Sequence, residues 1–178
     1  MEEGELVLHD EADELPDWDD DRRAMHCERV KASVVDNGGA IIGAFDLQPN
    51  GRQVLVGASV LDGRWLGKGR NTLDMYFLFV SNSLKDKYID AGGAQKAFRD
   101  GGVGGALLER CMLEAKARGA KTLYISAANG QHTVDFYLRR GAQFADEVLE
   151  ELTDKDDANA TFSGGFPDIQ LSRPLDDR

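Results

Sequence analysis

A glycine-rich segment followed by an amphipathic run constrains the fold of this chain more than any other feature. Four of the five residues 101–105 are glycines, and in residues 106–118 apolar side chains recur at helical spacing with charged side chains on the other face. Gly119 suits a left-handed helix end, and residues 122–127 (TLYISA) are rich in β-branched and aromatic residues. The segment therefore predicts a glycine loop, a helix and a strand, in that order.

The glycine loop is a candidate anion site. Glycine lets the backbone approach a ligand closely, and the first amides of a helix have no intrahelical acceptor and lie at its positive end. Arg99, Gly102 and Gly104 have the spacing Arg-x-x-Gly-x-Gly. The Lys-Ser/Thr ending of a P-loop is missing, and no acidic residue at the expected distance supports a dinucleotide site. We interpret the loop as phosphate-binding, with a flexible loop before a surface helix as the alternative.

Two ordered signatures in this region resemble the GCN5-related N-acetyltransferase (GNAT) superfamily. The residues that fit its Q/R-x-x-G-x-G/A loop for acyl-CoA are Arg99, Gly102 and Gly104. The residues that fit its Asn…Phe-Tyr-x-x-x-Gly segment are Asn129, Phe136, Tyr137 and Gly141. The resemblance covers about residues 73–144 closely. It implies an α/β fold with a mixed, mostly antiparallel sheet and a central parallel strand pair flanked by helices.

The resemblance also implies an activity, the direct transfer of an acetyl group from acetyl-CoA to a primary amine of a small-molecule or peptide acceptor, without a metal. The residues implied in holding the acyl-CoA are Leu78, Phe79, Val80, Arg99, Asp100, Gly101, Gly102, Val103, Gly104, Gly105 and Asn129. The first three would pair their backbone with the pantetheine arm, and the loop would hold the pyrophosphate. Tyr137 would protonate the leaving thiolate, or would serve only in packing. Asn129 would bond to the cofactor, or would cap a turn.

The base that deprotonates the acceptor amine is less clear. Asp74 is the first candidate, because strand alternation places it on one face with Tyr76, Leu78 and Val80. At about 3.3 Å per residue it lies roughly 13 to 20 Å from the end of that strand, so it would act through waters. Tyr76 and His132 are further candidates, and bulk water is the remaining alternative.

Two features depart from the family pattern. Asp100 places a carboxylate beside the proposed pyrophosphate site, where like charge should weaken binding unless the side chain points away. Residues 81–98 separate the preceding strand from the glycine loop by an insertion, which we expect to be either a lid or disordered. A non-catalytic acyl-CoA-binding sensor or interaction module is therefore the alternative function, and a nucleotide-binding protein is a third.

The remaining segments predict a single domain. We expect an acidic, mobile N-terminal segment over residues 1–21 and one acyltransferase-like domain over residues 22–178. A short helix is expected over residues 19–26, and residues 63–71 read as a hairpin connection. The expected strands are residues 29–36, 40–47, 53–61, 73–80, 122–127, 143–152 and 168–171, and a further helix is expected over residues 133–140.

Composition limits the partners. A net charge of −11, from 32 acidic and 21 basic residues, argues against nucleic-acid binding and favours either a cationic partner or simple solubility. The sequence has only two cysteines, which makes a disulfide framework improbable, and Cys111 falls on the apolar helix face as a packing residue. No apolar run is long enough to span a membrane, so we expect no membrane association and a cytoplasmic protein. The three histidines lack metal-ligand spacing, and a sheet edge is a candidate surface for a homodimer.

Overall fold

The computed structural model describes residues 20–81, 102–146, 149, 152 and 168–175. The expectations for the acidic N-terminal segment up to residue 19, for residues 82–98 of the insertion, and for Arg99, Asp100 and Gly101 lie outside the described residues. The elements, in chain order, are α1 (Asp20–Lys31), the π-helix η2 (Ala32–Asp36), β1 (Ala40–Leu47), β2 (Gln53–Leu61), β3 (Thr72–Val80), α2 (Val103–Ala117), β4 (Thr122–Ala127), α3 (Gln131–Leu138), β5 (Gln143–Phe144) and β6 (Ile169–Pro174).

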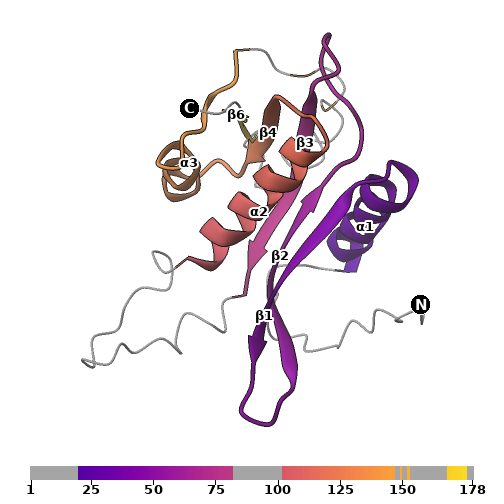
Figure 1. The fold of residues 1–178 in the computed structure, drawn as a ribbon, viewed down its shortest axis with the longest axis vertical. Coiled ribbons are helices and arrows are strands. Elements are labelled where there is room, and N and C mark those ends of the chain that lie inside the picture. Colours follow the sequence, from indigo (N-terminus) through magenta and orange to yellow (C-terminus); the bar gives the residue numbers. More distant parts are fainter. Residues whose placement is uncertain (1–19, 82–101, 147–148, 150–151, 153–167, 176–178) are drawn as a thin grey trace.

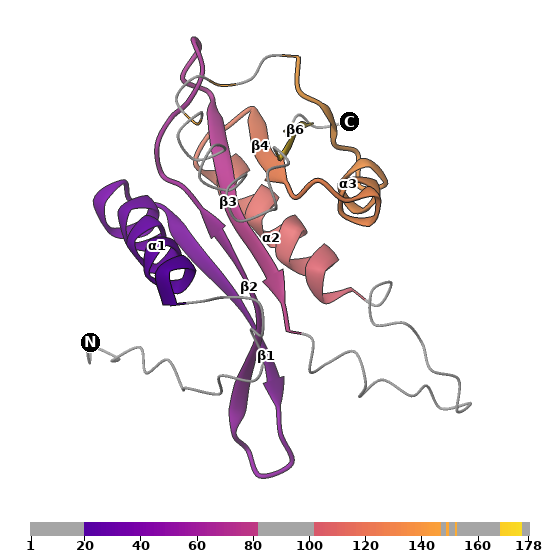
Figure 2. The same ribbon diagram turned by 180° about the vertical axis from the view of Figure 1, so that it is seen from behind.

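The described strands form one mixed sheet in the order β1-β2-β3-β4-β6-β5. Every neighbouring pair is antiparallel except β3 and β4, which are parallel and are joined through α2. Helix α2 covers one face of the sheet and α1 lies on the opposite face, as the two opposed views show (Figures 1 and 2). This arrangement confirms the predicted fold class.

The glycine turns separate the strands as the sequence predicts. Strands β1 and β2 cover residues 40–47 and 53–61, and Gly51 takes a positive φ of 82° in the turn between them. Residues 63–71 connect β2 to its antiparallel neighbour β3, which confirms the expected hairpin connection. The crossover helix is followed by Gly119 at a φ of 95°, the left-handed conformation that ends a helix.

The prediction of a strand over residues 29–36 is wrong. The helix that begins at Asp20 runs through this segment, and its last part widens into η2, where the Asn37 amide donates to the Ala32 carbonyl at 3.0 Å. The β-branched valines had suggested a strand, but local propensity is weak against tertiary contacts. The helical path buries Ser33 against the sheet, and the loop that follows leads into β1.

The last two strands also differ from expectation. Strand β5 covers only Gln143–Phe144, so the prediction of a strand through residue 152 is wrong in extent. Leu152 packs instead with Leu66 and Tyr124 in a small hydrophobic cluster, which explains the apolar character of the segment. Strand β6 begins one residue later than predicted and continues to Pro174.

The main core lies between α2 and the sheet. Helix α2 turns four fully buried side chains to the sheet, which are Leu107, Leu108, Cys111 and Ala115. Leu108, Cys111 and Ala115 pack with apolar residues of β3, β4 and α3 in one cluster. Burying each leucine contributes roughly 1.5–3 kcal/mol, so this interface fixes the position of α2 on the sheet.

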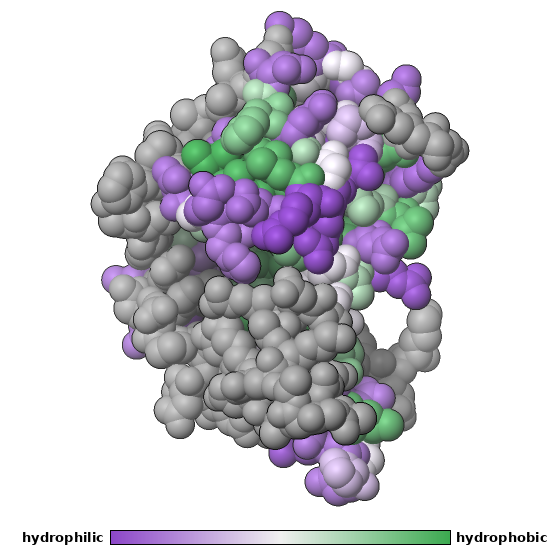
Figure 3. Space-filling view, turned by 90° about the vertical axis from the view of Figure 1, so that its left-hand side faces the viewer, coloured by the Kyte–Doolittle hydropathy of each residue, from purple (hydrophilic) through white to green (hydrophobic). Residues whose placement is uncertain are grey.

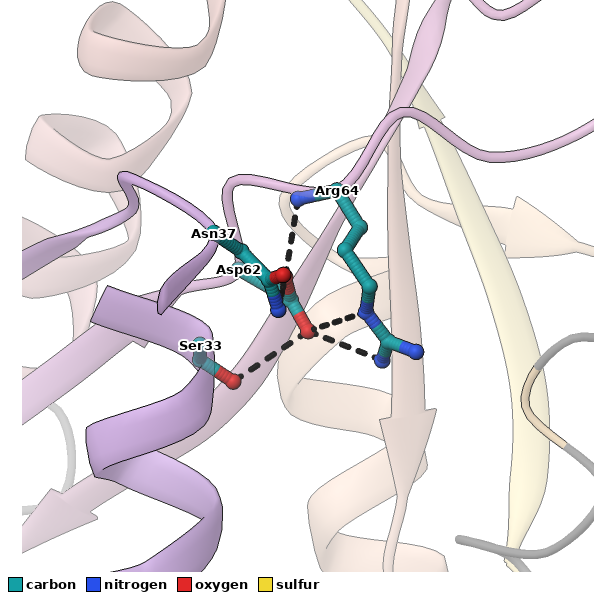
Figure 4. Close-up of polar contacts among 4 residues, drawn as sticks. All are labelled: Ser33, Asn37, Asp62 and Arg64. Carbon is teal, nitrogen blue, oxygen red and sulfur yellow. Dashed lines mark hydrogen bonds and ion pairs between the residues drawn. The ribbon is translucent and has the colours of Figure 1, made fainter. Parts of the chain in front are cut away.

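A buried carboxylate joins η2 to the β2–β3 connection (Figure 4). Asp62 is 1% exposed and accepts hydrogen bonds from Ser33 Oγ at 3.2 Å and Asn37 Nδ2 at 3.3 Å. Arg64 donates to the same carboxylate from its backbone amide at 2.8 Å, from Nε at 3.0 Å and from Nη2 at 2.9 Å. These bonds hold the end of the first helical segment against the sheet. In the part of the chain described, no helix has the length and apolarity needed to cross a membrane.

Candidate functional site

Strands β3 and β4 run side by side at one end and part at the other. Their parallel pairing extends from Thr72 and Thr122 to Met75 and Ile125. Beyond that point β3 continues to Val80, while the last residues of β4 remain paired with β6 on its other side. The sheet therefore opens between β3 and β4 along the second half of β3.

The backbone of β3 presents alternate residues to this opening. The Ser81 amide donates to the Val56 carbonyl of β2 at 2.9 Å, so the polar groups of Ser81 face β2. Backbone polar groups alternate along a strand, which turns those of Phe79 toward β2 as well and those of Leu78 and Val80 toward the opening. Of the three strand residues expected to pair with a pantetheine arm, Leu78 and Val80 therefore have the required backbone orientation.

The N-terminus of α2 lies beside the end of β3. Gly102 takes a φ of 116° just before the helix, a conformation that strongly favours glycine, and the described residues provide no side-chain cap. The amides of Val103, Gly104 and Gly105 stand in the first turn, where no carbonyl of the helix can accept from them. Gly104 and Gly105 thus belong to the helix itself, whereas the sequence had suggested a loop there.

The packing around Gly104 leaves room for a methyl group. A Cβ added to Gly104 would lie 3.5 Å from the Phe136 ring and 3.6 Å from Val80 Cγ2, which is ordinary contact. The protein itself therefore does not need glycine at this position. The first-turn amides, which have no acceptor within the helix, the helix dipole and the small side chain together suit a phosphate-sized anion.

Arg140 adds positive charge to this helix end. Its Cζ lies 4.0 Å above the Phe136 ring, and its Nη1 donates to the Phe136 carbonyl at 3.0 Å. Its Nε and Nη2 would both lie 3.2 Å from a Cβ added to Gly105, so the guanidinium rests against the first turn of α2. On the side of the molecule that carries α3, strongly hydrophilic residues lie next to hydrophobic ones (Figure 3).

Tyr137 is buried in the core that α2, α3 and β4 share. Its side chain is 6% exposed, and its ring meets that of Phe136 edge-on at 4.9 Å. Burial, and to a smaller extent the nearby Cys111, raises the pKa of the phenol well above its usual value. The packing role is therefore evident, and the phenol stays protonated at neutral pH, as a proton donor must.

Asn129 lies in the exposed turn between β4 and α3. Gly130 is the N-cap of α3, and no side-chain bond caps this helix within the described residues. The Gly130 amide donates to the Ala128 carbonyl at 2.7 Å, so the turn closes through its backbone. The Asn129 side chain is thus placed at the surface beside the end of β4, and a contact with a cofactor stays a prediction.

The expected position of Asp74 needs correction. Leu73 and Met75 pack in the α2-side core, yet so does Leu78, and Val80 lies next to Gly104 of α2. In a regular strand, odd- and even-numbered residues lie on opposite faces, so Leu73 and Met75 could not share a face with Leu78 and Val80. The register shift between Val60 and Leu61 inserts one residue into β3, and this insertion brings both pairs to the same face. Asp74 therefore points to the α1 face, away from the Leu78 and Val80 side chains, and it is 0% exposed.

Sequence reasoning missed two residues near the opening. Arg140 lies four positions after Phe136, and this helical spacing is the only sign of their contact. His26 was considered only as a possible metal ligand, but its Nδ1 lies 2.7 Å from the Tyr76 hydroxyl. The two residues are 50 positions apart, so only the tertiary structure could reveal the pair. No group of three or more potential metal ligands occurs in the described part of the chain.

Several solved structures share this fold. An aminoglycoside 6'-acetyltransferase type Ii has a TM-score of 0.59 at 18% identity, with 94% of this chain and 88% of that chain covered. An aminoglycoside 6'-N-acetyltransferase complexed with coenzyme A has a TM-score of 0.56 at 16% identity, with coverage of 94% and 89%. An acetyltransferase of the GNAT family from Staphylococcus aureus Mu50 has a TM-score of 0.54 at 17% identity, with coverage of 89% and 81%.

These likenesses confirm the acyl-CoA N-acyltransferase fold that the two sequence signatures implied. No protein-family model matches the sequence, and the search of curated proteins finds no relative. The chain therefore has the acyl-CoA N-acyltransferase fold. The described residues of the two sequence signatures lie around the first turn of α2 and between the end of β4 and the turn that follows α3.

Proposed function

We propose that this protein is an acetyl-CoA-dependent N-acetyltransferase that transfers the acetyl group directly to a primary amine. The observation that carries the proposal is the parting of β3 and β4 beside the N-terminus of α2, which has no side-chain cap among the described residues. An extended, amide-containing arm can pair with the exposed side of a strand, and a pyrophosphate can bind the amides of a helix start. Both kinds of site meet where Val80 approaches Gly104.

The residues present fit such a ligand. Leu78 and Val80 would bind the pantetheine arm through their backbone, and Val103, Gly104 and Gly105 would bind the pyrophosphate through their amides. Arg140 would offset part of the phosphate charge and would counter the carboxylate of Asp100 in the sequence before the helix. When bound, acetyl-CoA supplies an acetyl thioester.

The protein's own groups would then position the two substrates and protonate the leaving sulfur. A β3 amide directed into the opening can donate to the thioester carbonyl oxygen as negative charge develops there. Tyr137 would donate a proton to the departing sulfur, since its phenol is kept protonated by burial. Holding the amine against the carbonyl carbon would supply much of the acceleration through proximity.

Calorimetric titration with acetyl-CoA tests the cofactor, using two substitutions at one position. We expect micromolar binding by the wild-type protein and by Gly104→Ala, because a methyl group fits between Phe136 and Val80. Gly104→Glu should lose binding by at least about tenfold, since it adds bulk and negative charge at the anion site. Circular dichroism should show that both variants remain folded.

Three results of this titration and of a thiol-release assay with primary amines would argue against an acetyltransferase. No binding by the wild-type protein would contradict the proposal. Binding without turnover of kanamycin, spermidine or a peptide with a free N-terminus would favour the acyl-CoA sensor. Competition by ATP but not by CoA would favour a nucleotide-binding protein.

A further inference from the structure

One extra residue in β3 turns Tyr76 toward α1. Leu61 of β2 pairs with Met75, but the preceding residue, Val60, pairs with Phe77, which leaves Tyr76 as the inserted residue of a β-bulge. The rings of the consecutive residues Tyr76 and Phe77 both approach that of His26, with centroid distances of 6.0 and 5.9 Å. In a regular strand, consecutive side chains point to opposite faces, so the bulge creates this arrangement.

The bulge lies where the sheet opens. Met75 is the last residue of β3 that pairs with β4, and Tyr76 follows it directly. Leu78, whose backbone faces the opening, is two residues further, or about 7 Å along the strand. The Tyr76 side chain therefore stands on the α1 face at the closed end of the opening, whereas the proposed phosphate site lies at the far end of β3, beside α2.

His26 and Tyr76 are within hydrogen-bonding distance. The separation of 2.7 Å between His26 Nδ1 and Tyr76 Oη is that of a good hydrogen bond. Tyr76 is buried, while His26 is half-buried on α1 and can exchange protons with solvent. A buried hydroxyl bonded to a partly exposed imidazole is a suitable path for moving a proton from the interior to solvent.

We propose that Tyr76 and His26 form the proton relay that deprotonates the acceptor amine; this inference rests on the proposed acetyltransferase function. Tyr76 Oη accepts a proton from the ammonium group while it donates its own proton to His26 Nδ1. The amine becomes neutral and its lone pair forms a C–N bond to the thioester carbonyl carbon, while the imidazolium releases its proton to water. As the C–S bond breaks, Tyr137 protonates the leaving sulfur, and the second proton lost by the nitrogen restores the Tyr137 phenol. The relay gives the reaction the base that the sequence did not identify.

Other charged groups surround the pair. From β3, Asp74 shares the α1 face two residues before Tyr76, and its carboxylate would stabilise an imidazolium. From α1, Arg23 and Arg29 lie one helical turn to either side of His26 and would oppose that charge. The positive charge on a protonated His26 is thus favoured by one neighbour and opposed by two others. Because changing a neighbour would test only one of these effects, substitution of His26 itself is the direct test.

The test compares three variants of the full chain with the wild-type protein. His26→Asn retains a hydrogen-bonding group near the position of Nδ1 but cannot be protonated, and Tyr76→Phe removes only the hydroxyl. Glu28→Gln is the matched control, because Glu28 is an exposed titratable side chain on the same helix, two positions after His26. Acetyl-CoA affinity is measured by calorimetry, and kcat is measured by thiol release from pH 6 to 10 with kanamycin, spermidine and a peptide amine.

We expect the wild-type kcat to fall below about pH 7, where an imidazole becomes protonated. His26→Asn and Tyr76→Phe should lower kcat at pH 7 by about 100-fold, the scale of general-base catalysis. Their rates should then rise with pH without a plateau, while acetyl-CoA affinity stays within about twofold of wild type. The Glu28→Gln profile should match that of the wild-type protein.

The possible failures are distinguishable. If wild-type kcat and its pH profile persist in His26→Asn and Tyr76→Phe, the relay is wrong and the acetyltransferase function stands. If kcat and acetyl-CoA affinity fall in parallel, the pair has a structural role and the relay is again contradicted. If the wild-type protein binds acetyl-CoA but acetylates none of the three amines, the proposed function fails and the relay fails with it.

Discussion

At the scale of single residues, Tyr137 combines a packing role with a chemical one. Its ring lies in the core beside Phe136, and burial raises the pKa of its hydroxyl well above the usual value. A group with a raised pKa keeps its proton as the pH rises, so Tyr137 should cause no loss of activity below about pH 10. Removing the hydroxyl alone can therefore separate the two roles.

Tyr137→Phe should lower kcat by about 100-fold, because the leaving thiolate loses its proton donor. Acetyl-CoA affinity should stay within about twofold, and the free energy of unfolding should fall by less than about 1.5 kcal/mol because the ring is retained. Thiol release, calorimetry and urea unfolding provide the three measurements.

Tyr124→Phe is the control, since Tyr124 is a buried tyrosine on β4 in the separate cluster with Leu66. It should leave kcat unchanged. An unaltered kcat in Tyr137→Phe as well would remove Tyr137 from the mechanism and leave it a packing residue.

At the scale of elements, the buried carboxylate of Asp62 attaches the first helical segment to the sheet. Ser33 and Asn37 contact it from the helix end and the following turn, and Arg64 contacts it from the β2–β3 connection. The same helical segment carries His26 toward β3. The junction therefore positions the proposed relay as well as stabilising the fold.

Asp62→Ala should lower the free energy of unfolding by about 2–3 kcal/mol, because it leaves buried donors without an acceptor. Asp20→Ala should cost less than about 1 kcal/mol, since the Asp20 side chain is 99% exposed and lies 3.5 Å from Arg23. Urea-unfolding midpoints measure both. Equal losses in the two variants would show that the junction contributes little.

At the scale of the whole molecule, the core holds two acidic groups in their protonated form. Burial, reinforced by Asp74, raises the pKa of Cys111 to about 12, and Tyr137 in the same cluster is shifted in the same direction. In the unfolded chain a thiol titrates near 8.5 and a phenol near 10. Above about pH 9 the unfolded state therefore loses protons that the folded state keeps, and stability falls as the pH rises.

Cys111→Ala should reduce this alkaline loss of stability. Each proton retained only by the folded state lowers the free energy of unfolding by about 1.4 kcal/mol per pH unit as the pH rises. For Cys111 this decrease applies between about pH 9 and 12. Urea midpoints at pH 8 to 10.5 should therefore decline less steeply in Cys111→Ala than in Cys27→Ala, whose thiol is exposed. Equal slopes in the two variants would contradict the assignment.

The sequence determined the elements whose signals are local. Strands β1, β2 and β4 were predicted with their observed bounds, because alternating or β-branched runs end at turn residues such as Gly51. The buried face of α2 followed from helical periodicity, although the helix begins at Val103, inside the segment expected to be a loop. The left-handed Gly119 followed from its place at the helix end. These features depend on backbone geometry within a few residues, which the sequence shows directly.

Tertiary structure alone decided the rest. Residues 29–36 are helical although their valines favour a strand, and Ser33 and the following Asn37 bond to Asp62 across 29 and 25 positions. A single inserted residue at Tyr76 reversed the alternation of β3, which removed Asp74 from the face of Leu78 and brought His26 to Tyr76. Strand register and contacts between distant segments depend on how whole elements pack, and no local pattern in the sequence carries that information.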